Sequence, residues 1–434
     1  MSEAAANEVK KRGGARKKSD GDNALSLAEA RRARISKLTK AVIKKETGQE
    51  TIAGTISTMP HVSTGSILVD YLIGGSPAKD GKGPKCPGFP RRKITELYGP
   101  ESSGKTTLAL SAVADVQKKG GIAMFIDFEH ALDKGYAQTL GVSFEEDKLM
   151  FFQPDTMEEG FLMISRGVMF GVDMIVVDSV AAMVPALELE KKPGDNAKIG
   201  GIAKPMGENL PKFAGWLTKY PKNPETKETS KDEQGTALVF INQTRALIGG
   251  QSNETEGTPG GKALKFFAYV RLRTSRIFSE SVERIDPLTG KKKKFAYGNV
   301  TKVKCIKSKC DARQGHDVDI FIRYGYGIDN YFSVIQTASA QKIMKKDGSW
   351  ITYGGHRLQG RDKWRQFLIE NQSVYDELAL KVVAAVLLNA ETAIADEDLS
   401  EEDRILAELD DIDDMDEPKD APVEEVTVED PEGG

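Results

Sequence analysis

The chain has 434 residues, of which 39% are hydrophobic and 29% charged, and its formal net charge is −4. This length is enough for two or three domains, and the surplus of charge suggests that part of the chain lies outside any core. No uncharged apolar stretch reaches the roughly 18 residues of a membrane span, and the first residues hold no apolar run. We therefore expect neither a membrane span nor a secretory signal.

The three cysteines, Cys86, Cys305 and Cys310, are too few for a disulfide framework, which favours a reducing, cytoplasmic compartment. Cys305 and Cys310 have no second pair nearby, so their spacing predicts buried structural thiols rather than a zinc site. The four histidines are scattered and do not suggest a histidine-rich metal enzyme.

Charge is polarised along the chain. Residues 1–45 contain thirteen lysines and arginines against five acidic residues, whereas residues 396–434 contain nineteen acidic residues against two basic ones. We expect residues 1–24 to be a disordered basic segment and residues 396–434 to be a disordered acidic tail. Two roles remain open for these ends: they keep the protein in solution, or they recruit or compete with nucleic acid.

Residues 25–60 predict an N-terminal arm. Apolar residues at Ile35, Leu38 and Val42, with basic residues between them, indicate an amphipathic helix, and residues 51–56 indicate a short strand. Such a pair cannot bury its apolar faces alone, so it must dock on the core or on another subunit. The Gly-, Pro- and Lys-rich residues 75–92 predict an exposed loop.

From Lys93 onward, short apolar runs alternate with helical stretches, which predicts an α/β domain with a mostly parallel twisted sheet covered by helices. The runs lie at residues 94–99, 122–128, 173–180, 236–243 and 263–274. We place this core at residues 61–328. The alternation stops near Gly325, and residues 329–395 predict a small helical or α+β domain with basic residues at Lys342, Lys345, Lys346, Arg357, Arg361, Lys363 and Arg365.

The stretch from Gly99 to Thr107 matches the phosphate-loop pattern G-x-x-x-x-G-K-[ST]. It follows a predicted strand at residues 94–98 and precedes a predicted helix at residues 108–118, which is the context that phosphate binding needs. Glycines let backbone N–H groups converge on phosphate oxygens, and the helix N-terminus adds positive potential. The residues predicted to bind the nucleotide here are Gly99, Pro100, Glu101, Ser102, Ser103, Gly104, Lys105, Thr106 and Thr107.

Three further predicted strands end in polar residues. Asp178 follows an apolar strand, as does the carboxylate that holds Mg²⁺ in phosphate-loop enzymes, although an Asp there could also cap the next turn. Glu129 is the best candidate to polarise an attacking water. Gln243 could detect the γ-phosphate. The carboxyl ends of parallel strands meet at one edge, where α/β proteins bind ligands.

The chain resembles the bacterial RecA recombinases from about residue 25 to about residue 390. The stretches that carry the resemblance are STGS (63–66), GPESSGKTT (99–107), FIDFEHALD (125–133), QPDT (153–156), IVVDSVAA (175–182), FINQTR (240–245), GGKALKFFAYVRL (260–272), KVKCIKSK (302–309) and YGYGI (324–328). The resemblance implies a RecA-type phosphate-loop NTPase core. It also implies a helical filament on single-stranded DNA, with ATP and Mg²⁺ between subunits, that pairs with homologous duplex and exchanges strands.

Carried onto this chain, the resemblance implies that Lys105, Thr106 and Asp178 hold the triphosphate and Mg²⁺, with Thr106 and Asp178 on the metal. Glu129 would activate water, and Gln243 would couple the γ-phosphate to the following DNA loop. The remaining implied residues are Tyr136, which stacks on adenine, Asp133 near its amino group, and Lys307 and Lys309, which reach the neighbouring subunit's phosphates. The residues alone would favour a solvated strand edge for the two lysines. The N-terminal arm would dock on the adjacent protomer.

Two Gly-rich loops, at residues 187–204 and 244–261, would face DNA, whereas a plain surface excursion is the alternative. Their basic residues and glycines suit phosphate contacts without base reading. Ile199 and Ile248 are the apolar side chains that we expect to wedge between bases, unless they pack against their own loops. The residues assigned to DNA are Lys198, Ile199, Gly200, Lys204, Arg245, Ile248, Gly260 and Gly261.

The chain also departs from the family pattern. Residues 1–24 are extra, residues 75–90 and 223–234 form longer loops, and Gln251 and Ser252 replace a bulky apolar pair in the second DNA loop. These departures suit a phage-encoded or otherwise divergent member as well as a housekeeping one. A ring-forming helicase and a non-hydrolysing mediator remain alternatives, but the lysine pair, the N-terminal arm, Glu129 and Lys105 favour the recombinase.

Overall fold

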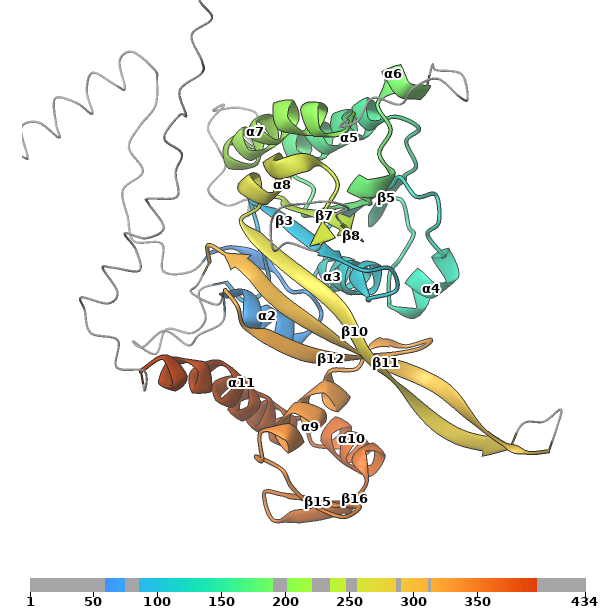
Figure 1. Ribbon diagram of the computed structural model, residues 1–434, viewed down its shortest axis with the longest axis vertical. Helices are drawn as coiled ribbons and strands as arrows, with labels where there is room; N and C mark the ends of the chain where they lie inside the picture. The colour runs from blue at the N-terminus through green and yellow to red at the C-terminus, as the bar shows by residue number, and fades with distance from the viewer. Residues whose placement is uncertain are drawn as a thin grey trace, which may run out of the picture. The chain divides into compact units, whose positions relative to one another are not determined.

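A nine-stranded sheet forms the centre of the computed structural model, which describes residues 59–74, 86–189, 201–220, 235–246, 256–285, 290–310 and 314–395 (Figure 1). From edge to edge the strands are β13 (Gly327–Ile328), β12 (Asp317–Arg323), β11 (Lys292–Ser308), β10 (Val270–Ile285), β3 (Ile94–Gly99), β7 (Ala237–Gln243), β6 (Met174–Asp178), β4 (Ala123–Asp127) and β5 (Leu149–Phe152). Strands from β10 to β5 pair in parallel, and β10 to β13 pair antiparallel. The predicted α/β class with a mostly parallel sheet is confirmed.

Two apolar layers cover the two faces of this sheet. Successive residues of β6 alternate between them, with Met174 and Val176 in one layer and Ile175 and Val177 in the other. The first layer is packed by α2 (Ile67–Gly74) and α3 (Lys105–Lys118), and the second by α5 (Met157–Phe170), α7 (Ala203–Lys219) and α8 (Gly261–Phe267). Burial on both faces explains why the central strands read as unbroken apolar runs.

The remaining elements of the core are short. They are β1 (His61–Val62), β2 (Phe89–Pro90), α4 (Lys134–Thr139), the 3-10 turn η2 (Val180–Ala182), α6 (Ala186–Leu189), β8 (Arg245–Ala246) and β9 (Glu256–Gly257).

Local sequence defines the ends of α5. Thr156 and Glu159 form a capping box, in which the Thr156 hydroxyl accepts a hydrogen bond from the Glu159 N–H and the Glu159 carboxylate accepts one from the Thr156 N–H. The helix ends at Gly171, whose φ of 80° suits glycine. This helix supports β6, the strand that presents Asp178.

A smaller α+β unit follows the sheet. Its elements are α9 (Asn330–Ala340), β14 (Lys345–Asp347), β15 (Trp350–Tyr353), β16 (His356–Gln359), α10 (Arg361–Glu370) and α11 (Gln372–Ala395). Trp364 is fully buried, and its indole N–H donates to the Ile351 carbonyl at 3.0 Å, which joins α10 to the small antiparallel sheet. Arg365 pairs with the buried Asp329 at 2.5 Å and so ties α10 to the N-terminal cap of α9.

Three predictions about elements are wrong. Residues 75–92 do not all form an exposed loop, because Cys86 and Phe89 are fully buried where the chain re-enters the first apolar layer. Residues 263–274 are not one strand, since α8 occupies their first part and β10 begins at Val270. The helix after the phosphate loop begins at Lys105, earlier than residue 108, because residues 105–107 already form its first turn.

The expectation of buried thiols is confirmed, since Cys86, Cys305 and Cys310 are all buried and none of them forms a disulfide. No helix in the described ranges is long and apolar enough to cross a membrane. The predicted N-terminal arm up to residue 58, the loop at residues 223–234 and the acidic tail lie outside the residues that the structure describes.

Candidate nucleotide and DNA sites

The phosphate loop joins the end of β3 to the start of α3 at the carboxyl edge of the sheet. Gly104 is the N-cap of α3 with a φ of 86°, and a Cβ there would lie 2.4 Å from Cδ1 of Ile322. Backbone conformation and space therefore both require glycine at this position. Because Gly104 has no side chain to cap the helix, the first N–H groups of α3 are left for an anion.

Lys105 lies in the first turn of α3 and is almost fully buried. Its Nζ donates to the carbonyl oxygens of Gly99 at 3.1 Å and Pro100 at 2.7 Å. Burial lowers the pKa of this amine, while the nearby carboxylates of Asp178 and Glu129 act in the opposite direction. The amine is thus positioned over the loop by weak acceptors that an anionic ligand can replace.

Thr106 and Asp178 meet from adjacent parts of the same edge. The Thr106 hydroxyl donates to Oδ2 of Asp178 at 2.8 Å. The pKa of Asp178 is raised to about 7, mainly by burial and also by the carboxylates of Glu129 and Asp127, while the Thr106 hydrogen bond and Lys105 oppose the rise. A hydroxyl and a buried carboxylate beside a phosphate loop are hard oxygen donors of the kind that Mg²⁺ prefers. The described residues contain no cluster of three or more acidic, His or Cys ligands, so a cation here would need oxygens from the nucleotide.

Glu129, Gln243 and Ser179 form one hydrogen-bonded group. The Gln243 amide donates to Oε1 of Glu129 at 2.8 Å, and the Ser179 hydroxyl donates to the same oxygen at 2.5 Å. Gln243 is the last residue of β7 and Ser179 follows Asp178 at the end of β6. The structure therefore brings together the predicted water-activating carboxylate and the predicted γ-phosphate sensor.

A cavity of about 350 Å³ continues from the phosphate loop. Residues 102–107 line it together with Tyr136, whose hydroxyl lies 2.9 Å from the Thr107 hydroxyl. Asp133 caps α4 by accepting from the Tyr136 N–H at 3.0 Å, so it holds Tyr136 in place and does not line the cavity itself.

Four further residues line this cavity without having been assigned to it from the sequence: Arg276, Asn299, Ile322 and Tyr324. Tyr324 belongs to the stretch YGYGI, which carried the resemblance, and this could have drawn attention to it. The others come from β10, β11 and β12, and only the pairing of these distant strands brings them to the phosphate loop.

Lys307 and Lys309 do not line the nucleotide cavity of their own chain. The Lys307 amine donates to the carbonyls of Lys265 at 2.9 Å and Phe266 at 3.0 Å, at the C-terminal end of α8. Burial, together with the nearby charges of Lys309 and Arg271, lowers the pKa of Lys307. The helix end therefore holds this amine in a fixed position on the surface.

A buried ion pair, missed by the sequence analysis, connects three central strands. Arg271 Nε of β10 donates to Oε2 of Glu96 of β3 at 2.6 Å, and the Asn242 amide of β7 donates to Oε1 of Glu96 at 3.0 Å. The same Asn242 amide donates to the Pro259 carbonyl at 2.9 Å. The end of the second predicted DNA loop is thereby fastened next to Gln243.

The described ends of the two predicted DNA loops lie against each other. A Cβ on Gly261 would lie 3.0 Å from Cβ of Ala203, and one on Gly260 would lie 3.2 Å from Cγ1 of Val180. Lys204 is exposed in the first turn of α7, and β8 pairs with β9 so that Arg245 is opposite Gly257. Four of the residues assigned to DNA lie outside the described ranges: Lys198, Ile199, Gly200 and Ile248.

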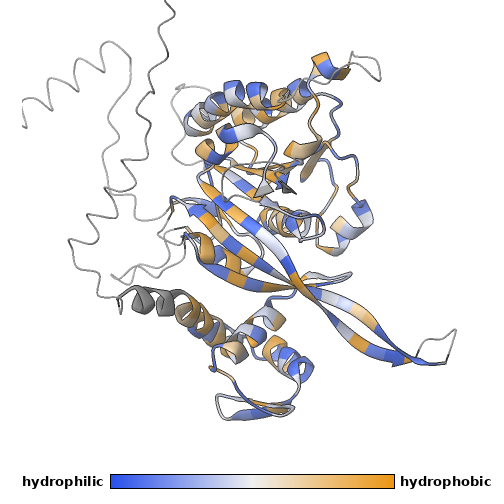
Figure 2. Cartoon of the chain, viewed as in Figure 1, coloured by the Kyte–Doolittle hydropathy of each residue, from blue (hydrophilic) through white to orange (hydrophobic). Residues whose placement is uncertain are grey.

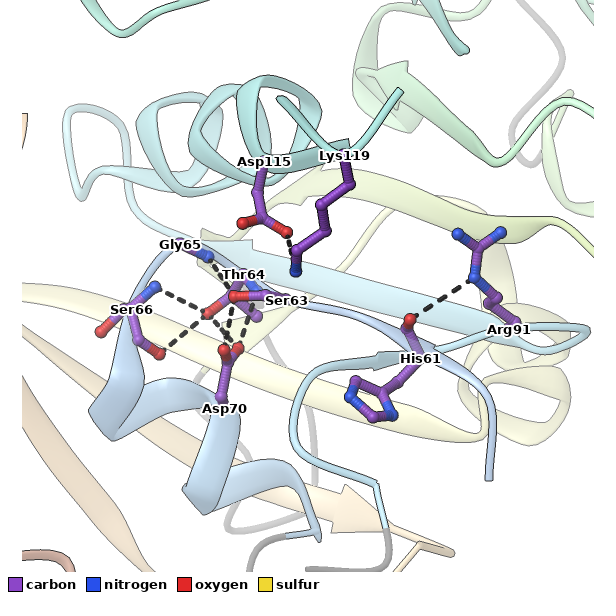
Figure 3. Close-up of polar contacts among 9 residues, drawn as sticks. All are labelled: His61, Ser63, Thr64, Gly65, Ser66, Asp70, Arg91, Asp115 and Lys119. Atoms are coloured by element: carbon purple, nitrogen blue, oxygen red, sulfur yellow. Dashed lines mark hydrogen bonds and ion pairs between the residues drawn. The ribbon is translucent and has the colours of Figure 1, made fainter. Parts of the chain in front are cut away.

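The STGS stretch forms a structural turn behind α3 (Figure 3). The Ser63 hydroxyl donates to Asp70 at 2.6 Å, and the Thr64 N–H and hydroxyl donate to its other oxygen, each at 2.7 Å. A Cβ on Gly65 would lie 2.9 Å from Cβ of Ser111 of α3. Burial raises the pKa of Asp70 to about 7, and the hydrogen bonds partly offset this effect. The turn thus packs the start of the core against the phosphate-binding helix.

Comparisons with known proteins agree with this geometry. The model of the RecA N-terminal domain matches residues 34–329, and that of the RecA C-terminal domain matches residues 333–387. Protein RecA of Rhodococcus jostii (strain RHA1) is 38% identical over 385 residues, which cover 87% of this chain and 96% of that protein. Protein RecA of Bifidobacterium longum (strain NCC 2705) is 42% identical over 325 residues, covering 74% of this chain and 72% of that protein.

Proposed function

The chain belongs to the RecA family, and from this premise we propose how its own residues bind ATP, hydrolyse it and respond to DNA. It is a DNA-dependent ATPase and recombinase that acts in recombination and DNA repair. The observation that carries the residue assignments is the group at the carboxyl edge of the sheet, where Lys105, Thr106, Asp178, Glu129 and Gln243 lie together. Because its three cysteines are buried thiols without a disulfide, which suits a reducing compartment, we place the protein in the cytoplasm.

The phosphate loop and the cavity beside it would bind ATP. Residues 99–107 would surround the phosphates with backbone N–H groups, and Lys105 would exchange its two carbonyl partners for phosphate oxygens. Tyr136 on the cavity wall would stack on the base, and Asp133 would hold Tyr136 in place. Thr106 and Asp178 would hold Mg²⁺, whose charge neutralises the phosphates when it is bound.

The hydrogen bond between Gln243 and Glu129 would take part both in ATP hydrolysis and in the response to DNA. Two donors occupy Oε1 of Glu129, and a γ-phosphate would compete for the Gln243 amide. Gln243 would turn toward the phosphate, Glu129 would accept a proton from the attacking water, and the displacement would reach Thr244 and the second DNA loop. The contacts of Asn242 with Glu96 and Pro259 hold the base of this loop while its start moves.

Contacts between neighbouring subunits would form the filament, and two loops would bind DNA within it. β5 is an edge strand that pairs only with β4 in the described sheet, so residues 51–56 of a neighbour could extend the sheet there. Lys307 and Lys309 would then reach the neighbour's phosphates. Residues 187–204 and 244–261 would bind single-stranded DNA along the axis and pair it with a homologous duplex.

The test is ATP hydrolysis with and without single-stranded DNA. A neighbour's lysines complete the site only in a filament, and the filament forms on single-stranded DNA. Hydrolysis should therefore depend on DNA. Glu129→Gln should abolish turnover while ATP binding survives, because the amide cannot take the proton from water. Equal turnover with and without DNA in the parent would contradict the proposal, as would full turnover in the Glu129→Gln variant.

A further inference from the structure

Strands β10 and β11 continue far beyond the sheet to which they belong (Figure 1). β10 pairs with β3 only over residues 270–273, and β11 pairs with β12 only over residues 298–304. Residues 276–280 pair with residues 298–301, and farther out residues 281–285 and 292–296 pair only with each other within the described chain; we call residues 276–285 and 292–301 the ribbon. At about 3.3 Å per residue, the two-stranded end of this ribbon extends roughly 15 Å past the sheet.

The ribbon leaves the sheet at its carboxyl edge. β10 is parallel to β3, and their pairing ends at Arg273 and Tyr98, next to the start of the phosphate loop. The second predicted DNA loop begins directly after the carboxyl end of β7 at this same edge, and the first follows β6 after the turn η2. The ribbon therefore projects on the side of the core where the DNA loops begin.

Basic residues dominate the end of the ribbon, which is coloured as hydrophilic over its last residues in Figure 2. Residues 291–294 are four consecutive lysines, all exposed, and none of them forms an ion pair with another described residue. Arg284 lies directly opposite Lys293 in the strand register. Like charges opposite each other destabilise a strand pair, so folding alone does not account for this arrangement, whereas an anionic ligand would relieve it.

Contacts with the small C-terminal unit hold the base of the ribbon in place. Arg361 of α10 pairs with Glu280 of β10 at 2.9 Å, and this removes one of the two described carboxylates on the ribbon. The other, Glu283, lies opposite Lys294. The end of the ribbon thus keeps a surplus of positive charge at a position set by the folded core.

We propose that the ribbon end, Lys291–Lys294 with Arg284, is an additional DNA site that binds the phosphate backbone of duplex DNA. Lysines on flexible stems neutralise phosphates without reading bases, as a protein that must accept any sequence requires. A two-stranded ribbon is also one of the shapes that the major groove admits. Apolar side chains at Ile277, Phe278, Val282 and Ile285 are exposed too, but they are spread along β10, whereas the charge is concentrated at one end.

The first test replaces Lys291, Lys292, Lys293 and Lys294 together by Gln in the full chain. Duplex binding is measured with ATP over a range of salt concentrations. Each lost phosphate contact lowers the slope of log affinity against log salt by about 0.9, so the slope should fall by roughly 2 to 4, with at least a tenfold loss of affinity at low salt. A matched control removes the same number of lysines from α3 and α7 by changing Lys118, Lys119, Lys212 and Lys219 to Gln.

The control should bind duplex like the parent, and the ribbon variant should keep its ATP hydrolysis on single-stranded DNA within about twofold of the parent. An unchanged salt slope in the ribbon variant would overturn the proposal, as would an equal loss in the control. Parallel loss of hydrolysis on single-stranded DNA would also overturn it, because the ribbon would then be a contact between proteins.

A second measurement does not depend on variants. Chemical acetylation of lysines in the parent, followed by mass spectrometry, should show Lys291–Lys294 protected when duplex is added and Lys118 and Lys212 unprotected. Equal modification of the ribbon lysines with and without duplex would overturn the proposal.

Discussion

Lys105 shows how one side chain can be positioned before its ligand arrives. Its amine is buried and held by the Gly99 and Pro100 carbonyls, which are weak partners for a positive charge. Lys105→Ala should weaken ATP binding by roughly 10- to 100-fold, because hydrogen bonds to charged groups contribute about 1.5–3 kcal/mol. Titration with a fluorescent ATP analogue measures this effect. Lys118→Ala, at the exposed end of the same helix, is the control, and equal affinities in all three proteins would contradict the assignment.

Asp178 makes the stability of the protein depend on pH. Burial raises its pKa from 3.8 to about 7 in the folded protein. Between these values the folded state keeps a proton that the unfolded chain has released, so the contribution of this group to stability falls as the pH rises from about 4 to about 7. At pH 8 the buried carboxylate is ionised and unfavourable, and a bound cation would compensate for it.

Asp178→Asn should therefore stabilise the nucleotide-free protein at pH 8, by on the order of a few kcal/mol, with a gain that shrinks steadily toward pH 5. The same change should weaken the Mg²⁺-dependent binding of ATP. Thermal unfolding across this pH range measures the first effect, and the exposed Asp147→Asn variant is the control. A gain that grows toward low pH would show that the carboxylate is stabilised, not destabilised, by its surroundings.

At the scale of elements, strands that follow a regular local pattern could be predicted from the sequence, whereas the pairing of strands far apart in the sequence could not. The apolar runs of β3, β4, β6 and β7 and the phosphate-loop pattern depend on residues close in sequence, so the strands and the group of Lys105, Asp178 and Glu129 could be predicted. The length of the β10–β11 ribbon and the arrival of Arg276 at the nucleotide cavity depend on strand order and register, which local patterns do not contain. The buried Glu96–Arg271 pair was missed for the same reason.

The two predicted DNA loops, residues 187–204 and 244–261, are expected to cover exposed base faces. Their C-terminal ends meet, since a Cβ on Gly261 would lie 3.0 Å from Cβ of Ala203. Stretched DNA exposes base faces, and we expect the stiff apolar side chains of Ile199 and Ile248 to cover them, since the polar Gln251 and Ser252 would lose water partners. Ile199→Ala and Ile248→Ala should each reduce strand exchange several-fold while ATP binding and unfolding temperature stay near parental values.

Strand exchange between single-stranded DNA and a labelled duplex measures this effect, with Gln251→Ala as the matched control in the second loop. If both isoleucine variants exchange strands at the parental rate while Gln251→Ala does not, the polar pair is the working element and the assignment to isoleucine is wrong.

At the scale of the whole molecule, opposite charges are separated along one chain. Nineteen acidic residues are concentrated in residues 396–434, whereas basic residues gather in residues 1–45, at the exposed Lys342, Lys345 and Lys346, and at the end of the ribbon. A tethered polyanion is at high local concentration, so we expect it to compete with DNA phosphate for the same lysines without any specific contact. The competition should weaken as salt screens both partners.

Removing residues 396–434 should therefore strengthen duplex binding several-fold at about 20 mM salt and have little effect near 0.5 M, where the screening length falls below about 5 Å. A full-length variant with the tail's Asp and Glu residues changed to Asn and Gln separates charge from chain length, and it should bind duplex like the truncated chain. If this neutral tail binds duplex like the parent, the tail acts through the volume it occupies. If neither variant differs from the parent at low salt, the acidic residues serve solubility, and the lysines of the ribbon and the C-terminal unit are open to DNA at all times.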